Sequence, residues 1–300
     1  MLKIAWTEEY VLPLPPKHRF PMEKYALIPE QLLYEGTVKD ENFFQPGVLT
    51  EELILSVHQP AYWDKLKNLE LTKQEIRSAG FPLNRALVDR EKRIGQGTLE
   101  CSLFALQFGI AMNVAGGTHH AFSYKGEGFC LINDIAVAAR HLLHKKLVSQ
   151  ILVIDLDVHQ GNGTAEIFQN EPQVFTFSMH GAKNYPLRKE ISDLDIGLPD
   201  FTEDTFYLKV LKETLPRLID QVEPDFVFYL AGVDILATDK LGRLGVSPLG
   251  CKERDRFVLD ICKRSELPTV VLMGGGYSPK IADIVEAHAN TFRLAQEIFF

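Results

Sequence analysis

Several short apolar runs place the strongest limit on how this chain folds. The runs Ile151–Asp155, Val174–Ser178, Phe226–Ala231 and Thr269–Met273 lie in its second half, and a similar run, Lys3–Trp6, lies near its start. They are nearly continuous in apolar residues rather than alternating with polar ones, which is typical of strands buried on both faces. The sequence therefore predicts a sheet that helices cover on two sides.

Amphipathic stretches, among them Ile135–Leu147 and Thr205–Val222, separate these runs. Alternation of strand and helix indicates a mostly parallel sheet with helices on both faces. We therefore expect an α/β fold of three layers, α/β/α. The Pro-rich segment Val11–Pro21 is expected to be an extended surface loop. No linker is visible in the 300 residues, so one domain over residues 1–300 is the simplest interpretation.

Composition narrows the classes of function. The formal net charge is −8 and no run of five or more Lys and Arg occurs, which argues against direct binding of nucleic acid. No apolar stretch reaches the roughly 18 residues that a membrane span needs, and the first ten residues are too acidic for a signal peptide. Four cysteines without C-x-x-C spacing favour a reducing compartment. We therefore expect a cytoplasmic protein without a membrane partner.

Polar residues follow three of the predicted strands directly. The first strand end is followed by Asp157 and His159, the second by Asp234, and the third by the run Gly274–Tyr277. Open parallel sheets bind ligands beyond the carboxyl ends of their strands. The sequence therefore predicts that these residues meet at one rim of the sheet.

Two carboxylates and one imidazole at this rim indicate a metal site. Asp157 and His159 are two residues apart, so in extended backbone their side chains point to the same side. With Asp234 they leave a position open for water and substrate, as catalytic zinc sites do. An alternative is that Asp157 and His159 only cap the helix that follows. Asp155, just inside the strand end, must be paired or hydrogen-bonded if it is buried.

A tandem pair of histidines, His119 and His120, follows two glycines, which indicates a loop that brings both imidazoles against a ligand. The run Gly274–Gly276 lacks the Walker pattern and instead permits a sharp turn and close backbone approach. The phenol of Tyr277 is then expected to point into the site, with a packing role as the alternative. We expect surface, capping or packing roles for the other histidines, His18, His58, His141, His144, His180 and His288.

Six motifs, in the expected order, resemble the histone deacetylase family within the arginase/deacetylase fold. They are GGTHHAF (116–122), GEGFCLINDIAVAA (126–139), ILVIDLDVHQGNGTAEIF (151–168), VFTFSMH (174–180), AGVDILATDKLGRLGVS (231–247) and MGGGY (273–277). The segment PPKHRFPMEKY (15–25) looks like the amino-terminal signature of bacterial-type members. The resemblance thus covers nearly the whole chain.

The resemblance implies a zinc-dependent hydrolase that removes acetyl or longer acyl groups from an amine nitrogen, in acyl-lysine of proteins or in a small acylated amine. One Zn²⁺ ion is implied at Asp157, His159 and Asp234. The implied catalytic residues are His119, His120, Tyr277, Asp155 and Asn162. The implied substrate-binding residues are Gly128, Phe129 and Gly275. A structural K⁺ ion is implied near Asp155, Asp157, His159, Ser178 and Met179.

One position departs from many family members. The second histidine is often backed by an aspartate, and the matching residue here is Asn162, a variant that resembles the class IV branch. A neutral amide orients the ring but does not stabilise an imidazolium as a carboxylate does. We therefore expect His120, the candidate general base, to differ from His119, which Asp155 orients. No rim aspartate can be matched, because residues 71–96 are too divergent to align.

Two other classes of protein remain as alternatives. A ureohydrolase of the same fold uses two manganese ions and a D-x-H-x-D run, and the last position of that run is Gly161 here, so the second metal lacks a ligand. A non-catalytic acyl-binding or metal-binding module would keep the pocket without the chemistry. The presence of the ligands, both histidines and the tyrosine opposes this second alternative.

Overall fold

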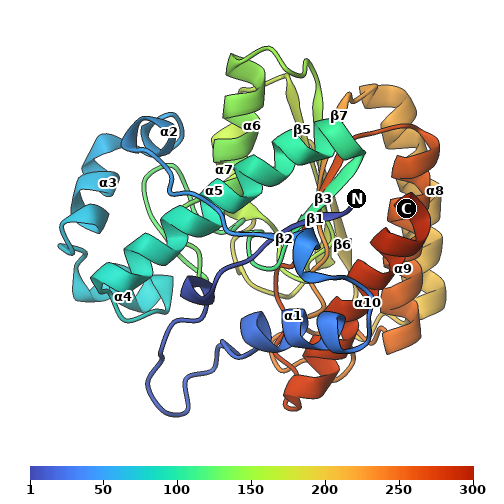
Figure 1. Ribbon diagram of the computed structural model, residues 1–300, viewed down its shortest axis with the longest axis horizontal. Helices are drawn as coiled ribbons and strands as arrows, with labels where there is room; N and C mark the ends of the chain where they lie inside the picture. Colours follow the sequence, from blue (N-terminus) through green and yellow to red (C-terminus); the bar gives the residue numbers. More distant parts are fainter.

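The centre of the molecule is one sheet of eight parallel strands. The computed structural model describes all 300 residues (Figure 1). The strands lie in the order β2-β1-β3-β8-β7-β4-β5-β6, and every neighbouring pair is parallel. Their bounds are β1 Lys3–Ala5, β2 Phe43–Phe44, β3 Ile110–Asn113, β4 Ile151–Asp155, β5 Val174–Gly181, β6 Leu194–Leu198, β7 Phe226–Leu230 and β8 Thr269–Leu272.

All five predicted strands are present, within a few residues of the predicted bounds. β5 continues to Gly181, beyond the predicted end at Ser178, because its last residues pair with β6. Three strands were not predicted: β3, which lies inside the sheet, and β2 and β6, which lie at its two edges. β2 has only two residues, and β6 alternates between exposed and partly covered side chains, so neither shows a continuous apolar run.

Helices cover both faces of this sheet, which confirms the predicted three-layer α/β/α fold. Figure 1 shows α5, α6 and α7 on one side of the strands and α8, α9 and α10 on the other, with α1 packed on α10. The bounds are α1 Lys24–Tyr34, α2 Glu51–Leu55, α3 Pro60–Lys67, α4 Lys73–Ala79, α5 Arg85–Phe108, α6 Asp134–His144, α7 Asn162–Phe168, α8 Asp204–Val222, α9 Pro248–Arg264 and α10 Ile281–Phe299. That residues 1–300 form a single domain remains a prediction.

The Pro-rich segment is a loop, as predicted, but it does not lie wholly on the surface. Leu12 and Phe20 are buried, and Phe20 turns toward the carboxyl ends of the strands.

None of the ten helices combines the length and apolar character needed to cross a membrane. The four cysteines are free and buried, and a cytoplasmic location remains a prediction from their number and spacing.

Candidate active site

The carboxyl ends of the central strands β4 and β7 bring together the three predicted metal ligands. His159 Nδ1 lies 3.0 Å from Asp157 Oδ1 and 3.1 Å from Asp234 Oδ2, and one ligand atom of each residue lies within 4.8 Å of the others. All three side chains are buried. Burial alone would lower the pKa of His159, but the two carboxylates raise it to about 10. This donor set therefore favours a positive charge and fits a divalent cation.

Backbone amides hold both carboxylates in place. The N–H of Gly275 donates to Asp157 Oδ2 over 2.7 Å, and the N–H of Val158 donates to Asp234 Oδ1 over 2.9 Å. Position 275 requires glycine because a Cβ there would collide with the Asp234 carboxylate. The Gly275 carbonyl accepts a hydrogen bond from Val233 N–H. Both polar backbone groups of Gly275 are therefore engaged within the protein, and its role in binding substrate remains a prediction.

Asp157 and His159 do not cap the helix that follows them. The residue at the amino-terminal cap of α7 is Gly161, and no side chain forms a capping hydrogen bond there. The alternative interpretation of these two residues as a helix cap is therefore wrong. A Cβ at Gly161 would collide with the Asp155 carboxylate, so the backbone leaves no room for a further metal ligand at this position.

The loop that carries the two histidines is folded by glycines and by one buried aspartate. Gly116 and Gly117 adopt positive φ values of 86° and 77°, which glycine accommodates without strain. Asp134 accepts hydrogen bonds from the N–H groups of Gly117 and Thr118, over 3.0 and 2.8 Å. The two imidazole rings that follow are buried, with centroids 4.1 Å apart.

The two imidazoles have different partners. His119 Nδ1 lies 2.7 Å from Asp155 Oδ2. Burial lowers the pKa of His119, but the Asp155 carboxylate outweighs it and raises the pKa to about 9. His120 Nδ1 lies 2.6 Å from Asn162 Oδ1, and burial together with the neighbouring imidazole of His119 holds the pKa of His120 well below its usual value. At neutral pH, His119 therefore favours the charged form and His120 the neutral one.

A buried carboxylate that sequence reasoning missed lies behind Asn162. Asn162 Nδ2 donates to Glu127 Oε1 over 2.7 Å, and Glu127 Oε2 accepts from Lys125 Nζ over 2.7 Å. A carboxylate accepts hydrogen bonds and does not donate them. Glu127 therefore keeps the NH₂ group of Asn162 pointing toward itself, and the amide oxygen of Asn162 points toward His120. The signal in the sequence was a charged residue between two glycines, Gly126 and Gly128.

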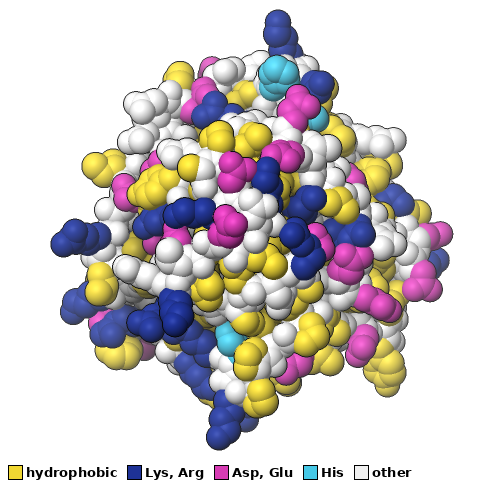
Figure 2. Space-filling model, turned by 90° about the vertical axis from the view of Figure 1, so that its left-hand side faces the viewer, with side chains coloured by type: hydrophobic (Ala, Val, Ile, Leu, Met, Phe, Trp, Pro, Cys, Tyr) yellow, Lys and Arg dark blue, Asp and Glu magenta, His cyan; other side chains and the backbone are white.

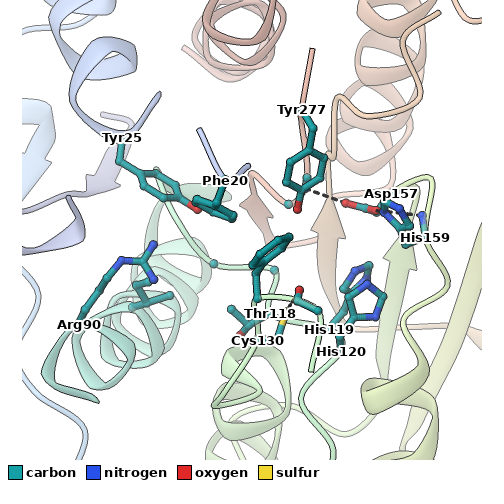
Figure 3. Close-up of a pocket in the computed structure, with 17 residues that line it drawn as sticks. Phe20, Tyr25, Arg90, Thr118, His119, His120, Cys130, Asp157, His159 and Tyr277 are labelled. Atoms are coloured by element: carbon teal, nitrogen blue, oxygen red, sulfur yellow. Dashed lines mark hydrogen bonds and ion pairs between the residues drawn. The ribbon is translucent and has the colours of Figure 1, made fainter. Parts of the chain in front are cut away.

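Aromatic side chains enclose the space in front of the histidines. Figure 3 shows the Tyr277 ring pointing into this space from one side and Asp157, His159, His119 and His120 bordering it from another. The Phe129 ring lies 5.1 Å from that of Phe20 and 6.0 Å from that of Tyr277, between centroids. Gly128 and Phe129 both line the cavity.

The cavity opens outward into a mouth of about 350 Å³. The mouth shares His120, His159, Gly128, Phe129 and Tyr277 with the inner part. Further residues, none of them predicted, line it as well: Arg19, Arg77, Ser78, Tyr185 and Leu241. Burial and the Glu127 carboxylate raise the pKa of Tyr185, so this phenol remains protonated at the mouth.

The residues predicted to surround a potassium ion lie around the end of β4. Ser178 of β5 is in register with Asp155 of β4, and Met179, which follows Ser178, is fully buried.

The remaining histidines lie outside the group of three predicted metal ligands. Among them, His58 is buried and hydrogen-bonded: its Nδ1 lies 3.0 Å from Phe122 O, and its Nε2 accepts from Asn133 N–H over 3.0 Å.

Sequence comparisons relate this chain to proteins of one family. A family model described as histone deacetylase domain matches residues 18–292. An uncharacterized protein of Picosynechococcus is 42% identical over 99% of both chains. Histone deacetylase 2 of Arabidopsis thaliana is 29% identical over 89% of this chain and 72% of its own length. The acetoin utilization protein AcuC of Staphylococcus aureus is 27% identical, over 87% and 72% respectively.

Solved structures share the whole fold. A histone deacetylase homologue complexed with SAHA has a TM-score of 0.85 at 23% identity and covers 99% of this chain and 84% of its own. A homologue from Aquifex aeolicus has a TM-score of 0.83 at 23% identity, with 98% and 84% covered. At such identities the likeness concerns the fold alone. The match of the family domain over residues 18–292 shows that the chain belongs to the histone deacetylase family.

Proposed function

We propose that this member of the family is a zinc-dependent deacylase acting on acyl-lysine or on a small acylated amine. One observation carries the proposal: metal-ligand side chains, a pair of imidazoles and a phenol border the same cavity. A metal site, a group able to accept a proton and a hydrogen-bond donor are the parts that hydrolysis of an amide requires.

Asp157, His159 and Asp234 would hold one Zn²⁺ ion. When bound, such an ion supplies Lewis acidity toward the amide carbonyl and toward a water molecule. The lack of room for a side chain at Gly161 opposes a second metal, and with it the binuclear manganese chemistry of a ureohydrolase. A structural K⁺ ion near the end of β4 remains part of the proposal, supported by the placement of Asp155 and Ser178 in adjacent strands.

In this scheme His120 takes up the proton of the attacking water and later passes it to the leaving amine. Its Nδ1 donates to Asn162, so the lone pair of its other nitrogen, Nε2, is free to accept a proton. Asn162 and Glu127 are positioning residues, since they fix which His120 nitrogen carries the hydrogen. His119, charged beside Asp155, supplies positive charge next to the reacting groups.

Tyr277 is proposed to donate its phenolic hydrogen to the oxygen of the amide as negative charge develops there. Such a donor is worth about 3–4 kcal/mol of transition-state stabilisation in comparable sites. Its backbone N–H donates to Asp239 Oδ2 over 2.6 Å, which fixes the residue behind the glycine run. The Phe20 and Phe129 rings offer apolar walls for the methylene stem of an acyl-lysine.

A fluorogenic acetyl-lysine amide, capped at both ends, tests the proposal. We expect metal-dependent hydrolysis: a chelator abolishes it, stoichiometric Zn²⁺ restores it, and the purified chain holds one ion. Asp234→Asn is expected to lose both the ion and the turnover, whereas Asp220→Asn, an exposed carboxylate on α8, retains both. Turnover that survives removal of metal contradicts the scheme. Binding of the amide without any turnover supports the non-catalytic module instead.

A further inference from the structure

Two arginines at the mouth of the active-site cavity have no acidic partner. Arg19 and Arg77 line the mouth, and no Asp or Glu does. The ion pairs of the chain engage seven of its thirteen arginines, and Arg19 and Arg77 are not among those seven. The absence of a carboxylate is notable because the whole chain carries a net charge of −8. The mouth is thus positive on a protein that is negative overall.

The fold holds both arginines near the wall of the active-site cavity that Gly128 and Phe129 form. The guanidinium carbon of Arg19 lies 5.0 Å from the centroid of the Phe129 ring, a cation–π contact. Arg77 precedes Ser78, whose carbonyl accepts from Gly128 N–H over 3.0 Å, and the next carbonyl, that of Ala79, accepts from Phe129 N–H over 2.8 Å. These two bonds fasten the end of α4 to the wall of the channel.

The positive charge continues outside the mouth. A neighbouring groove of about 850 Å³ is lined by Lys17, Arg19 and Lys240, with Glu23 as its one acidic residue. Figure 2 shows the side of the molecule that is on the left in Figure 1, where α4 and the first loop lie. Lys and Arg side chains run along its lower left to the lower tip, with few acidic side chains among them. A patch of one sign attracts ligands of the other sign.

We infer that the preferred substrate carries a carboxylate on the part that stays outside the cavity, where it meets Arg19 and Arg77 when the acylated stem fills the cavity. The inference rests on the proposed deacylase function and adds the chemical class of the carrier. The planar fork of a guanidinium matches a carboxylate in two parallel hydrogen bonds. The carboxylate has two sources: an acidic side chain flanking an acyl-lysine in a peptide, or the α-carboxylate of a free acyl-lysine. A polycationic acylated amine is repelled.

A panel of acetyl-lysine substrates that differ only in charge outside the channel tests this inference. The panel contains a neutral doubly capped acetyl-lysine, peptides with Asp or with Lys on both sides, an acetyl-lysine with a free α-carboxylate, and an acetylated polyamine. An exposed ion pair changes an equilibrium by up to about fivefold. Two arginines therefore predict about a tenfold higher kcat/KM for the Asp-flanked peptide than for the Lys-flanked one, measured at low salt. A gain of the free-carboxylate substrate over the Asp-flanked peptide identifies the α-carboxylate as the source.

Variants assign the preference to the mouth. The double variant Arg19→Gln/Arg77→Gln is expected to remove the preference through KM, and Arg19→Lys/Arg77→Lys to keep part of it. The matched control Arg217→Gln, an exposed arginine on α8 at the opposite side of the molecule, keeps all of it. High salt suppresses the preference in the native protein.

The outcomes separate this inference from the function beneath it. Hydrolysis of the neutral substrate with equal kcat/KM for the Asp-flanked and Lys-flanked peptides overturns the inference and leaves the deacylase function standing. The same holds if the double variant keeps the full preference. Failure to hydrolyse every member of the panel overturns the deacylase function, and the inference with it.

Discussion

Replacing Asn162 by aspartate tests the buried hydrogen bonds behind His120. Aspartate is often found at this position in the family, so the change looks conservative. In this chain, however, Asn162 Nδ2 donates to Glu127 Oε1 over 2.7 Å, and Asn162→Asp places two carboxylates in contact. At that separation, with an effective dielectric constant of about 20, two negative charges repel by about 6 kcal/mol. This repulsion corresponds to a pKa raised by about 4.5 units for one carboxyl group of the pair.

The consequence is a stability loss that grows with pH. A carboxyl group that titrates near 3.9 in the unfolded chain would titrate above 8 in the folded variant, so at neutral pH folding must take up a proton. Relative to the native protein, Asn162→Asp is expected to lose about 4 kcal/mol of unfolding free energy at pH 7 and about 1.5 kcal/mol at pH 5. Urea denaturation followed by circular dichroism, with a chelator present to remove any contribution from bound metal, measures both values.

The double variant Glu127→Gln/Asn162→Asp is the control. The amide that it carries at position 127 donates to the new carboxylate at position 162. One hydrogen bond of reversed direction therefore replaces the repulsion, and most of the lost stability is expected to return. Equal losses for Asn162→Asp at pH 5 and pH 7 would refute the reasoning. So would a double variant that is no more stable than Asn162→Asp alone.

Three further predictions concern the rest of the site. Tyr277→Phe is expected to keep the fold and the bound metal but to lower kcat by about 10²- to 10³-fold on the neutral acetyl-lysine amide; a kcat within twofold of the native value excludes the oxyanion role. Burial lowers the pKa of His58 to about 4, below its unfolded value near 6.5. The contribution of neutral His58 to the unfolding free energy is therefore complete above pH 6.5, and about 3 kcal/mol of it is lost as the pH falls to 4. His58→Gln is expected to flatten the dependence of the unfolding free energy on pH in this range, measured by urea denaturation. An unchanged dependence contradicts the assignment. Gly161→Ala forces the Asp155 carboxylate away from His119, so it is expected to destabilise the fold by about 1–3 kcal/mol and to lower turnover. An unaltered melting temperature and an unaltered kcat would show that position 161 has room for a side chain.

The centre of the fold and of the site followed from sequence for a simple physical reason. β4 and β7 are buried on both faces, so their apolar runs are unbroken and the first polar residues after them mark the strand ends. The cluster of predicted metal ligands therefore follows from local sequence and the rule that ligands gather at those ends. The family resemblance added the pairing of His119 with Asp155 and the placement of Asn162 behind His120.

Other parts depend on contacts that no local pattern contains. Glu127 meets Asn162 across 35 residues of chain, because the loop after His120 folds back on the start of α7. The position of Arg77 depends on two hydrogen bonds between the end of α4 and the Gly128–Phe129 wall, in a region that could not be aligned. The edge strands β2 and β6 escaped prediction because an edge strand faces solvent and does not need a continuous apolar run.

The position of β8 in the sheet has a consequence for how the chain reaches its folded state. β8 is the last strand to be synthesised, yet it lies in the middle of the sheet, between β3 and β7. Until the ribosome has released residues 269–272, the strands on its two sides cannot be joined into one sheet. Gly275 and Tyr277 follow directly after β8. The site is therefore completed by the same late step that closes the sheet, so a nascent chain that stops before β8 holds neither a closed core nor a complete site.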